Sequence, residues 1–353
     1  MAGYFSRNTK CGMNVKIRPG FIVYESGEGP VYVCPHSGGA LEVPTSRDDN
    51  SETVASICWL RTGGTLIVST LPRKPMFGID YNRDAPPKTL SLKMWDSFIR
   101  GENNEELEKY RNNYAWVSGS AADHAVRLRI YRDFWKTVGS YGKTVLFMHR
   151  KFTRMKNYPS IIEVMTADGW GANRNIMRNI ISAVNRKYAA FFREIAPNYR
   201  KAILLEHERV ADRIKEMFGA FDLKKMMAEY RNNTVRDVEV ITKYASNKTA
   251  IRLERSFTEK NFNAALKSAL SANIQPRVTL EAIFSGDKAL GSKRPLSKIR
   301  NVLEIECNTF ISYWYPGMAS DIIIDMIKEI RSFTKLPMYF NGEKNGNKRL
   351  QAV

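Results

Sequence analysis

Short runs of β-forming residues alternate with helical segments along this chain, and this order is the strongest constraint on its fold. The runs that predict strands are 31–34, 65–70, 144–149 and 302–307. Helices are expected between the first three, at 52–61 and 123–138. Because parallel strands need long crossover connections, this order predicts an α/β fold with a mainly parallel sheet. The runs at 21–25 and 31–34 flank Gly27-Glu28-Gly29 and are predicted to pair with each other.

The chain divides into an α/β body and a helical segment. Apolar residues recur at helical spacing over 174–245, and the α/β pattern then returns. We therefore expect one discontinuous α/β domain formed by 1–173 and 246–340. The segment 174–245 is expected to be a helical insertion or cap, and 341–353 a flexible polar tail.

Composition indicates a globular protein with an excess of positive charge. Hydrophobic residues make up 43% of the chain, and no apolar run approaches the roughly 20 residues that span a bilayer, so we expect no membrane segment. The four cysteines form no Cys-x-x-Cys pair, which favours free thiols and a cytoplasmic location. The net charge of +19 leaves nucleic acid open as a partner. No zinc-finger or aromatic RNA-binding motif accompanies that charge, so this partner is not favoured. The oligomeric state is not predicted.

Two of the four histidines stand at the ends of predicted strands. His36 follows the run at 31–34, and His149 ends the run that begins at Thr144. Neighbouring strands would bring both imidazoles to one point, and imidazole is a common zinc ligand. A structural, hydrogen-bonded role is the alternative for each histidine. A carboxylate from the acidic segment 48–52 would complete a three-ligand site that leaves a fourth position for water. We take Glu52 as this ligand, with Asp49 as its rival.

Several motifs occur along the chain in a recognisable order, namely Pro35-His36-Ser37-Gly38, Glu52, Arg73, Asp80-Tyr81-Asn82-Arg83, His149 and Glu306. This order resembles that of the N-formylglutamate amidohydrolase family. That family has a Pro-His-(Ser/Ala)-Gly turn, an acidic residue that opens a helix, an Arg after a strand, an Asp-x-Asn-Arg segment, a strand ending in His and a strand carrying Glu. The resemblance covers about 30–150 and 260–332, and the helical segment has no counterpart.

The resemblance implies a three-layer α/β/α sandwich similar to the zinc exopeptidases, with a mostly parallel mixed sheet. It implies one zinc ion per chain, held by His36, Glu52 and His149. The implied reaction is hydrolysis of the amide bond of an N-acyl amino acid, N-formyl ones included, or of a small peptide-like compound. The resemblance also selects Glu306 as general base and acid over Glu304, which shares its strand face. Glu254 is a weaker candidate for the same catalytic role.

Asn82 and Arg83 resemble the pair that holds the substrate carboxylate in zinc carboxypeptidase-like enzymes. A guanidinium can bind a carboxylate through two parallel hydrogen bonds. The structural alternative is a salt bridge from Arg83 to Asp80 or Asp84. Arg73 is a further candidate to line the substrate site.

The second histidine departs from the family pattern. Family members have Asp-x-His-Ser there, whereas this chain has Phe147-Met148-His149-Arg150. Arg150 either weakens metal binding or recognises an acidic substrate, and we include it among the substrate-binding candidates. The expected substrate is therefore a small anionic molecule. The alternative function is a non-catalytic relative that binds nucleic acid, or a protein through its helical segment.

Overall fold

The computed structural model describes residues 12–39, 47–100, 105–141, 144–151, 159–167, 169–218, 275–282 and 301–333, with the single residues 102, 260, 296 and 299. The strands are β1 (Asn14–Arg18), β2 (Phe21–Ser26), β3 (Val31–Cys34), β4 (Gly64–Ser69), β5 (Thr144–Lys151), β6 (Ser160–Met165), β7 (Arg277–Leu280) and β8 (Asn301–Asn308). The helices are α1 (Ser51–Thr62), α2 (Lys88–Ile99), α3 (Glu105–Asn113), α4 (Ala121–Ser140), α5 (Arg174–Lys187), α6 (Ala189–Phe218), α12 (Thr309–Trp314) and α13 (Pro316–Phe333). None of the helices in these ranges is both long and apolar enough to cross a membrane.

The strands form one mixed sheet in the order β1-β2-β4-β3-β5-β8-β6-β7. The central neighbours β4, β3, β5 and β8 are parallel, as the alternation of strands and helices predicts. Strands β1, β2 and β6 add antiparallel pairings. The α/β class and the mostly parallel mixed sheet are therefore confirmed.

The predicted pairing of the first two runs is wrong, because β4 lies between β2 and β3 and hydrogen-bonds to both. Glycines allow this close approach. A Cβ on Gly64 would lie 2.2 Å from the carbonyl oxygen of Pro30, and one on Gly29 would lie 2.7 Å from the nitrogen of Gly64. The chain can therefore place β4 against the loop that joins β2 to β3.

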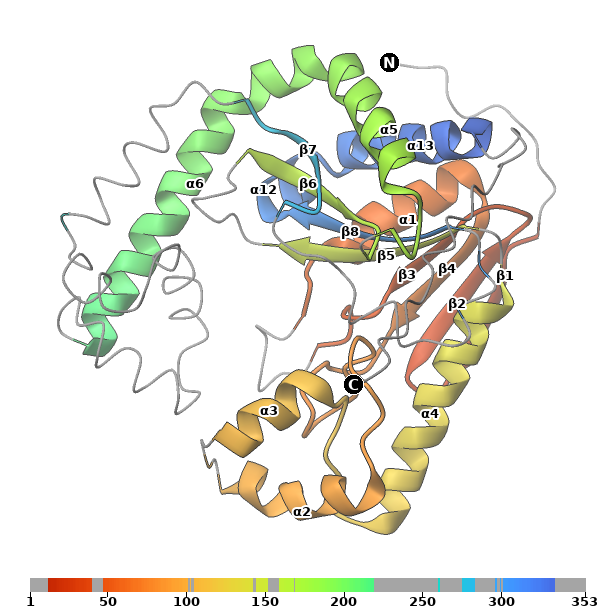
Figure 1. Cartoon of the computed structure of the whole chain (residues 1–353), viewed down its shortest axis with the longest axis vertical. Helices are drawn as coiled ribbons and strands as arrows, with labels where there is room; N and C mark the ends of the chain where they lie inside the picture. Colours follow the sequence, from red (N-terminus) through yellow and green to blue (C-terminus); the bar gives the residue numbers. More distant parts are fainter. Residues whose placement is uncertain are drawn as a thin grey trace, which may run out of the picture.

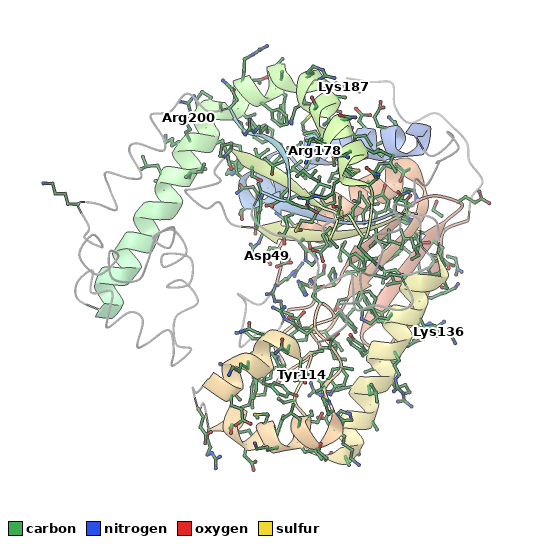
Figure 2. The ribbon with its side chains drawn as sticks, viewed as in Figure 1. Asp49, Tyr114, Lys136, Arg178, Lys187 and Arg200 are labelled. Atoms are coloured by element: carbon green, nitrogen blue, oxygen red, sulfur yellow. The ribbon has the colours of Figure 1, made fainter. Side chains whose placement is uncertain are left out.

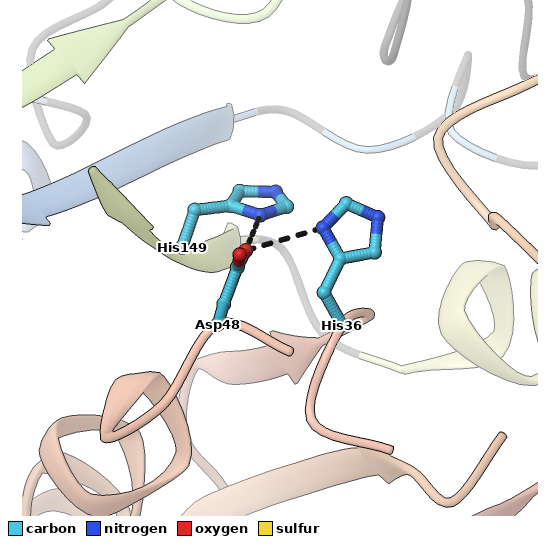
Figure 3. Close-up of side chains that lie close together, drawn as sticks. All are labelled: His36, Asp48 and His149. Carbon is cyan, nitrogen blue, oxygen red and sulfur yellow. Dashed lines mark hydrogen bonds and ion pairs between the residues drawn. The ribbon is translucent and has the colours of Figure 1, made fainter. Parts of the chain in front are cut away.

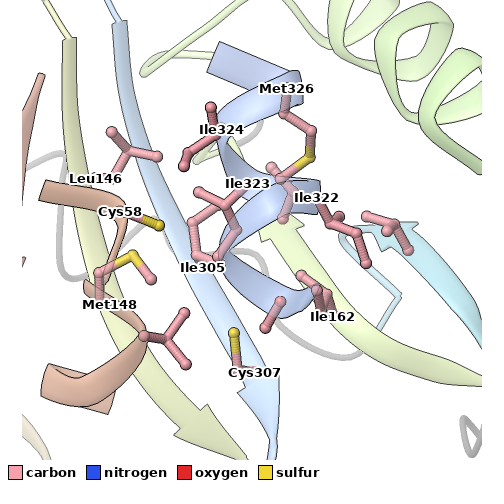
Figure 4. Close-up of a cluster of buried hydrophobic side chains, with 14 of the residues drawn as sticks. Cys58, Leu146, Met148, Ile162, Ile305, Cys307, Ile322, Ile323, Ile324 and Met326 are labelled. Atoms are coloured by element: carbon pink, nitrogen blue, oxygen red, sulfur yellow. The ribbon is translucent and has the colours of Figure 1, made fainter. Parts of the chain in front are cut away.

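Helices cover both faces of the sheet, which gives three layers (Figure 1). On one face, α1, α5, α6 and α13 bury an apolar core against alternate residues of the strands, including Leu146, Met148, Ile305 and Cys307 (Figure 4). On the other face, α4 packs Phe134 and other aromatic residues onto the sheet. Side chains alternate between faces along a strand, so Phe147 joins the second core while Met148 joins the first.

The helical segment contributes to the first core from its beginning. Met177, Ile180 and Val184 of α5 are buried with the strands, and Asn173 caps α5 by accepting hydrogen bonds from two backbone N–H groups. The division into an α/β body and an insertion stays a prediction. The tail at 341–353, Glu254 and the part of the predicted helical segment at 219–245 lie outside the described residues.

The topology marks one place for a site. After β3 the chain crosses through α1 to β4 on one side, and β5 joins β3 on the other side. At such a switch point the connections diverge and leave a crevice beyond the carboxyl ends of the strands. His36 follows β3, and His149 lies near the end of β5, so both histidines lie at this switch point.

Candidate metal centre

The two strand-end histidines meet, as the sequence predicts. The centroids of the His36 and His149 rings lie 4.9 Å apart, and each residue is only 3% exposed. A carboxylate, that of Asp48, lies between the rings (Figure 3). Its Oδ2 atom is 3.2 Å from Nδ1 of His36 and 3.0 Å from Nδ1 of His149.

These three buried side chains have the donor types and spacing of a metal site. Each offers one ligand atom, and the three atoms lie within 4.8 Å of one another. Two imidazoles and one carboxylate match the ligand sets of catalytic zinc sites, which leave a further position open. The group could therefore hold a divalent metal ion.

The structure places Asp48, rather than the predicted ligand Glu52, beside the two histidines. Glu52 lies in the first turn of α1 and pairs with Arg47 instead. Asp48 precedes that helix, and its backbone N–H donates to the carbonyl of His36 at 3.0 Å. This bond holds Asp48 against the turn that carries His36. The rival Asp49 points to Arg150, with 3.2 Å between Oδ2 and Nη1.

A second carboxylate orients His36. Oδ1 of Asp80 lies 3.0 Å from Nε2 of His36, on the opposite side of the ring from Asp48. A metal-ligating histidine usually donates its other N–H to a carboxylate in this way, which fixes the tautomer and leaves the first nitrogen for the metal. Asp80 is therefore well placed to support a metal ligand.

Buried charges set the electrostatics of the centre. Burial and the Arg73 cation act to lower the pKa of His36, but Asp80 and Asp48 outweigh them and raise it above its ordinary value. Burial would raise the pKa of Asp48, yet hydrogen bonds from His149 and His36 hold it well below its usual range. Asp80 likewise has a pKa far below normal, because the neighbouring cations outweigh its burial. Both carboxylates are therefore ionised, as a metal ligand and its supporting acid should be.

Asn82 approaches the other histidine. Its Nδ2 lies 3.4 Å from Nε2 of His149, while its Oδ1 is buried without a hydrogen-bond partner among the described residues. Oxygen and nitrogen of an amide exchange places when the group turns over. In the turned orientation Oδ1 would accept from an Nε2–H group, and that tautomer leaves Nδ1 of His149 free to bind a metal. The buried Oδ1 of Asn82 therefore fits a state in which Nδ1 of His149 binds a metal.

The predicted substrate-binding arginines lie at different positions around the centre. Arg73 touches it directly, with Nη1 3.3 Å from Nδ1 of His36 and 3.4 Å from Oδ1 of Asp48. Arg83 is 30% exposed, and its Nε lies 3.9 Å from Oδ2 of Asp80. That contact is the salt bridge named as the structural alternative, and the roles of both arginines toward a substrate stay predictions.

Arg150 points to the loop before α1. Its Nη1 donates to Oδ2 of Asp49 and its Nη2 to the carbonyl of Arg47, both at 3.2 Å. Figure 2 shows Asp49 beside the carboxyl ends of the central strands. Asp48 lies between these two contact points in the chain, so Arg150 connects β5 to the loop that carries a candidate ligand.

Glu306 lies opposite His149 across the β5–β8 pairing, so the two share one face of the sheet. Its Oε2 is buried and has no hydrogen-bond partner among the described residues. Burial, and secondarily the charge of Asp48, raise the pKa of Glu306 to about 8, although His149 acts in the other direction. A carboxyl group with a pKa near neutrality can both accept and donate protons at physiological pH.

A buried ion pair lies on the same face beyond Glu306. Nζ of Lys151 is 2.9 Å from Oε2 of Glu163 and 2.5 Å from Oγ of Ser160. Lys151 is 4% exposed and Glu163 0%. Burial lowers the pKa of Lys151, which Glu163 partly offsets.

Sequence reasoning missed the roles of Asp48 and Asp80, although both stand in segments that it singled out. Asp48 opens the acidic segment, and its backbone bond to His36 gives no local sequence signal. Asp80 begins the Asp-x-Asn-Arg segment, where it was considered only as a partner of Arg83. Asn82 was assigned to a substrate, and the structure shows its contact with His149.

Comparison with known proteins finds similar solved structures only at low identity. No protein-family model matches the chain, and no curated protein sequence matches it significantly. A gene product of Agrobacterium tumefaciens matches 89% of this chain and 94% of its own, with 11% identity and a TM-score of 0.44. The N-formylglutamate amidohydrolase of Ralstonia eutropha matches 90% of this chain and 99% of its own, with 12% identity and a TM-score of 0.37.

Proposed function

We propose that this protein is a metal-dependent hydrolase that cleaves the amide bond of an N-acyl amino acid or a small peptide-like compound. One observation carries the proposal, namely the buried group of His36, Asp48 and His149 at the switch point of the sheet. Zinc is the proposed ion because its catalytic sites combine imidazole and carboxylate ligands. When bound, zinc supplies Lewis-acid polarisation of a carbonyl and lowers the pKa of water.

Glu306 is the proposed proton carrier. Its unpartnered carboxyl oxygen and a pKa of about 8 suit a group that takes a proton from the attacking water and passes it to the leaving amine. Water adds its oxygen to the acyl carbon, the C–N bond breaks, and the amine leaves with the transferred proton. The products are a carboxylate and a free amine.

The arginines suit a substrate that carries negative charge. Arg73 brings a cation to His36 and Asp48, where the carbonyl oxygen would gain charge during attack. Arg83 is the proposed ligand of the free carboxylate of the amino acid, since a planar guanidinium can bind it through two hydrogen bonds. A small anionic molecule is therefore the proposed substrate.

The cytoplasm is the proposed location. Cys34, Cys58 and Cys307 are free and buried, which suits a reducing compartment.

Metal analysis tests the proposal directly. Protein purified without a histidine tag should contain about one zinc ion per chain, and Asp48→Asn and His149→Ala should each lose it. Glu52→Gln is the matched control from the same acidic segment and should retain zinc.

Glu306→Gln should also retain zinc, while turnover of N-formyl or N-acetyl amino acids falls by about 10²–10⁴-fold. Wild-type protein that holds no divalent metal after zinc reconstitution would remove the hydrolase proposal.

A further inference from the structure

Strand β1 is an outer strand of the sheet (Figure 1) and carries an exposed apolar stripe. Val15 and Ile17 on this strand, and Met13 just before it, are 42%, 80% and 62% exposed. The other strongly exposed large apolar residues among those described lie on helices and loops. Alternate residues of a strand share one face, so these three form a single stripe.

The stripe continues the main core of the molecule. Across the sheet, Leu146, Tyr32, Leu66, Tyr24 and Val15 are successive cross-strand partners. The first three are buried, and the ring of Tyr24 packs 5.9 Å from that of Trp59 on α1. The row of apolar partners therefore runs from the buried centre to Val15 and ends there without a neighbouring strand among the described residues.

The other face of β1 is held by charged and polar contacts. Asn14 Nδ2 and Lys16 Nζ each lie 2.7 Å from the carboxylate of Glu25, which also accepts from the hydroxyl of Tyr141 at 2.5 Å. A free lysine commonly protects an edge strand against pairing. Here the ammonium group of Lys16 binds Glu25 of β2 in its own sheet, so it does not protect the outer edge of β1 from pairing with another strand.

We propose that β1 pairs with β1 of a second copy of this chain, and that the two sheets join into one continuous sheet. A two-fold axis makes the paired strands antiparallel and the contact self-complementary. With the axis at Val15, this valine faces its own copy, and Ile17 faces Met13 of the second copy. Every apolar residue of the stripe then meets an apolar residue.

Among axes at Val15, Lys16 and Ile17, charge favours the one at Val15. With the axis at Val15, Lys16 lies opposite the neutral Asn14 of the second copy. An axis at Lys16 would place two lysines face to face, and one at Ile17 would place Lys16 against Arg18. Like charges directly opposite each other destabilise a strand pair. The partner that best fits both the stripe and its charges is therefore the chain itself.

Sedimentation or light scattering tests the dimer on the full chain. As concentration rises to roughly 100 µM, the mass should rise from 40.4 kDa toward twice that value. Val15→Asp places two carboxylates at the axis and removes two buried valines, so the dissociation constant should rise by about 100-fold or more. Val126→Asp is the matched control, because Val126 is 45% exposed on α4, and it should leave the dimer intact.

A second variant tests the register without touching the stripe. Asn14→Lys should weaken the dimer by about 2- to 30-fold, because each new lysine faces Lys16 of the other copy. Circular dichroism checks that each variant is folded. Wild-type protein that remains at 40.4 kDa, Val15→Asp that dimerises like Val126→Asp, or Asn14→Lys with an unchanged dissociation constant would each overturn the proposal.

Discussion

Removing the side chain of Arg150 should weaken zinc binding, because this residue holds the loop that carries Asp48. Arg150 bonds to the residue before Asp48 and to the residue after it, through the Arg47 carbonyl and the Asp49 carboxylate. These two bonds hold the loop against β5, the strand that carries His149. Arg150→Ala therefore frees the loop that places Asp48 between the histidines.

The magnitude follows from the two bonds. Hydrogen bonds to charged groups contribute about 1.5–3 kcal/mol each. The bond to Asp49 is discounted for solvent screening, since that side chain is 39% exposed. Loss of groups that orient metal ligands typically costs about 10–100-fold in metal affinity. We expect the zinc dissociation constant of Arg150→Ala to rise by that factor, with the fold retained.

Competition with a chromophoric zinc chelator measures this change without any substrate. Arg61→Ala is the matched control, because Arg61 also contacts an aspartate and a carbonyl, those of Asp321 and Gly317, but links α1 to α13. It should leave the zinc affinity unchanged. Arg150→Lys should fall between wild type and Arg150→Ala, because an ammonium cannot reproduce the two-point contact.

Folded Arg150→Ala that binds zinc within about twofold of wild type would contradict this role of Arg150. If that variant instead raises KM for an acidic substrate at unchanged zinc affinity, Arg150 binds the substrate. Absence of zinc from the wild type is a separate result that concerns the proposed function.

Two further predictions concern the substrate and the buried ion pair. Arg83→Lys should lower kcat/KM for N-acyl amino acids by at least tenfold, because each charge-assisted hydrogen bond contributes about 1.5–3 kcal/mol. The same variant should have little effect on their C-terminal amides, and equal losses on both substrates would make Arg83 structural. Lys151→Met removes the cation that pairs with the buried carboxylate of Glu163, so the free energy of unfolding in urea should fall by about 3–5 kcal/mol. Combining it with Glu163→Leu should recover much of that loss, and a double variant as unstable as Lys151→Met would contradict the assigned pair.

Local patterns predicted most elements that surround the centre. Strand and helix periodicity is a property of neighbouring residues, so the sequence indicated β3, α1, β4, α4, β5 and β8 close to their observed bounds. The short strands β1 and β6 went unpredicted. Ser120 caps α4, because its side chain accepts a hydrogen bond from the backbone N–H of Asp123.

These local patterns do not predict contacts between residues that are far apart in the chain. The insertion of β4 between β2 and β3 depends on glycines more than 30 residues apart in the chain, Gly29 and Gly64. The choice of Asp48 over Glu52 depends on backbone hydrogen bonding to His36 and on the pairing of Glu52 with Arg47. A sequence pattern shows that several carboxylates are near in the chain, but not which one points into the crevice.

The sequence by itself determined the α/β class, the place of both histidines at strand ends and the glutamate on the partner strand. Each of these follows from the alternation of residues along single elements. The tertiary structure decided which acid lies between the two histidines. It also decided that Asp80 contacts Nε2 of His36 and that Asn82 contacts Nε2 of His149. The bond from Arg150 to the loop that carries Asp48 likewise depends on tertiary structure. These contacts join residues 12 to 103 positions apart. They depend on how the strands are ordered and how the loops close over them, because side-chain direction at a site is set by packing between elements rather than by the pattern within one.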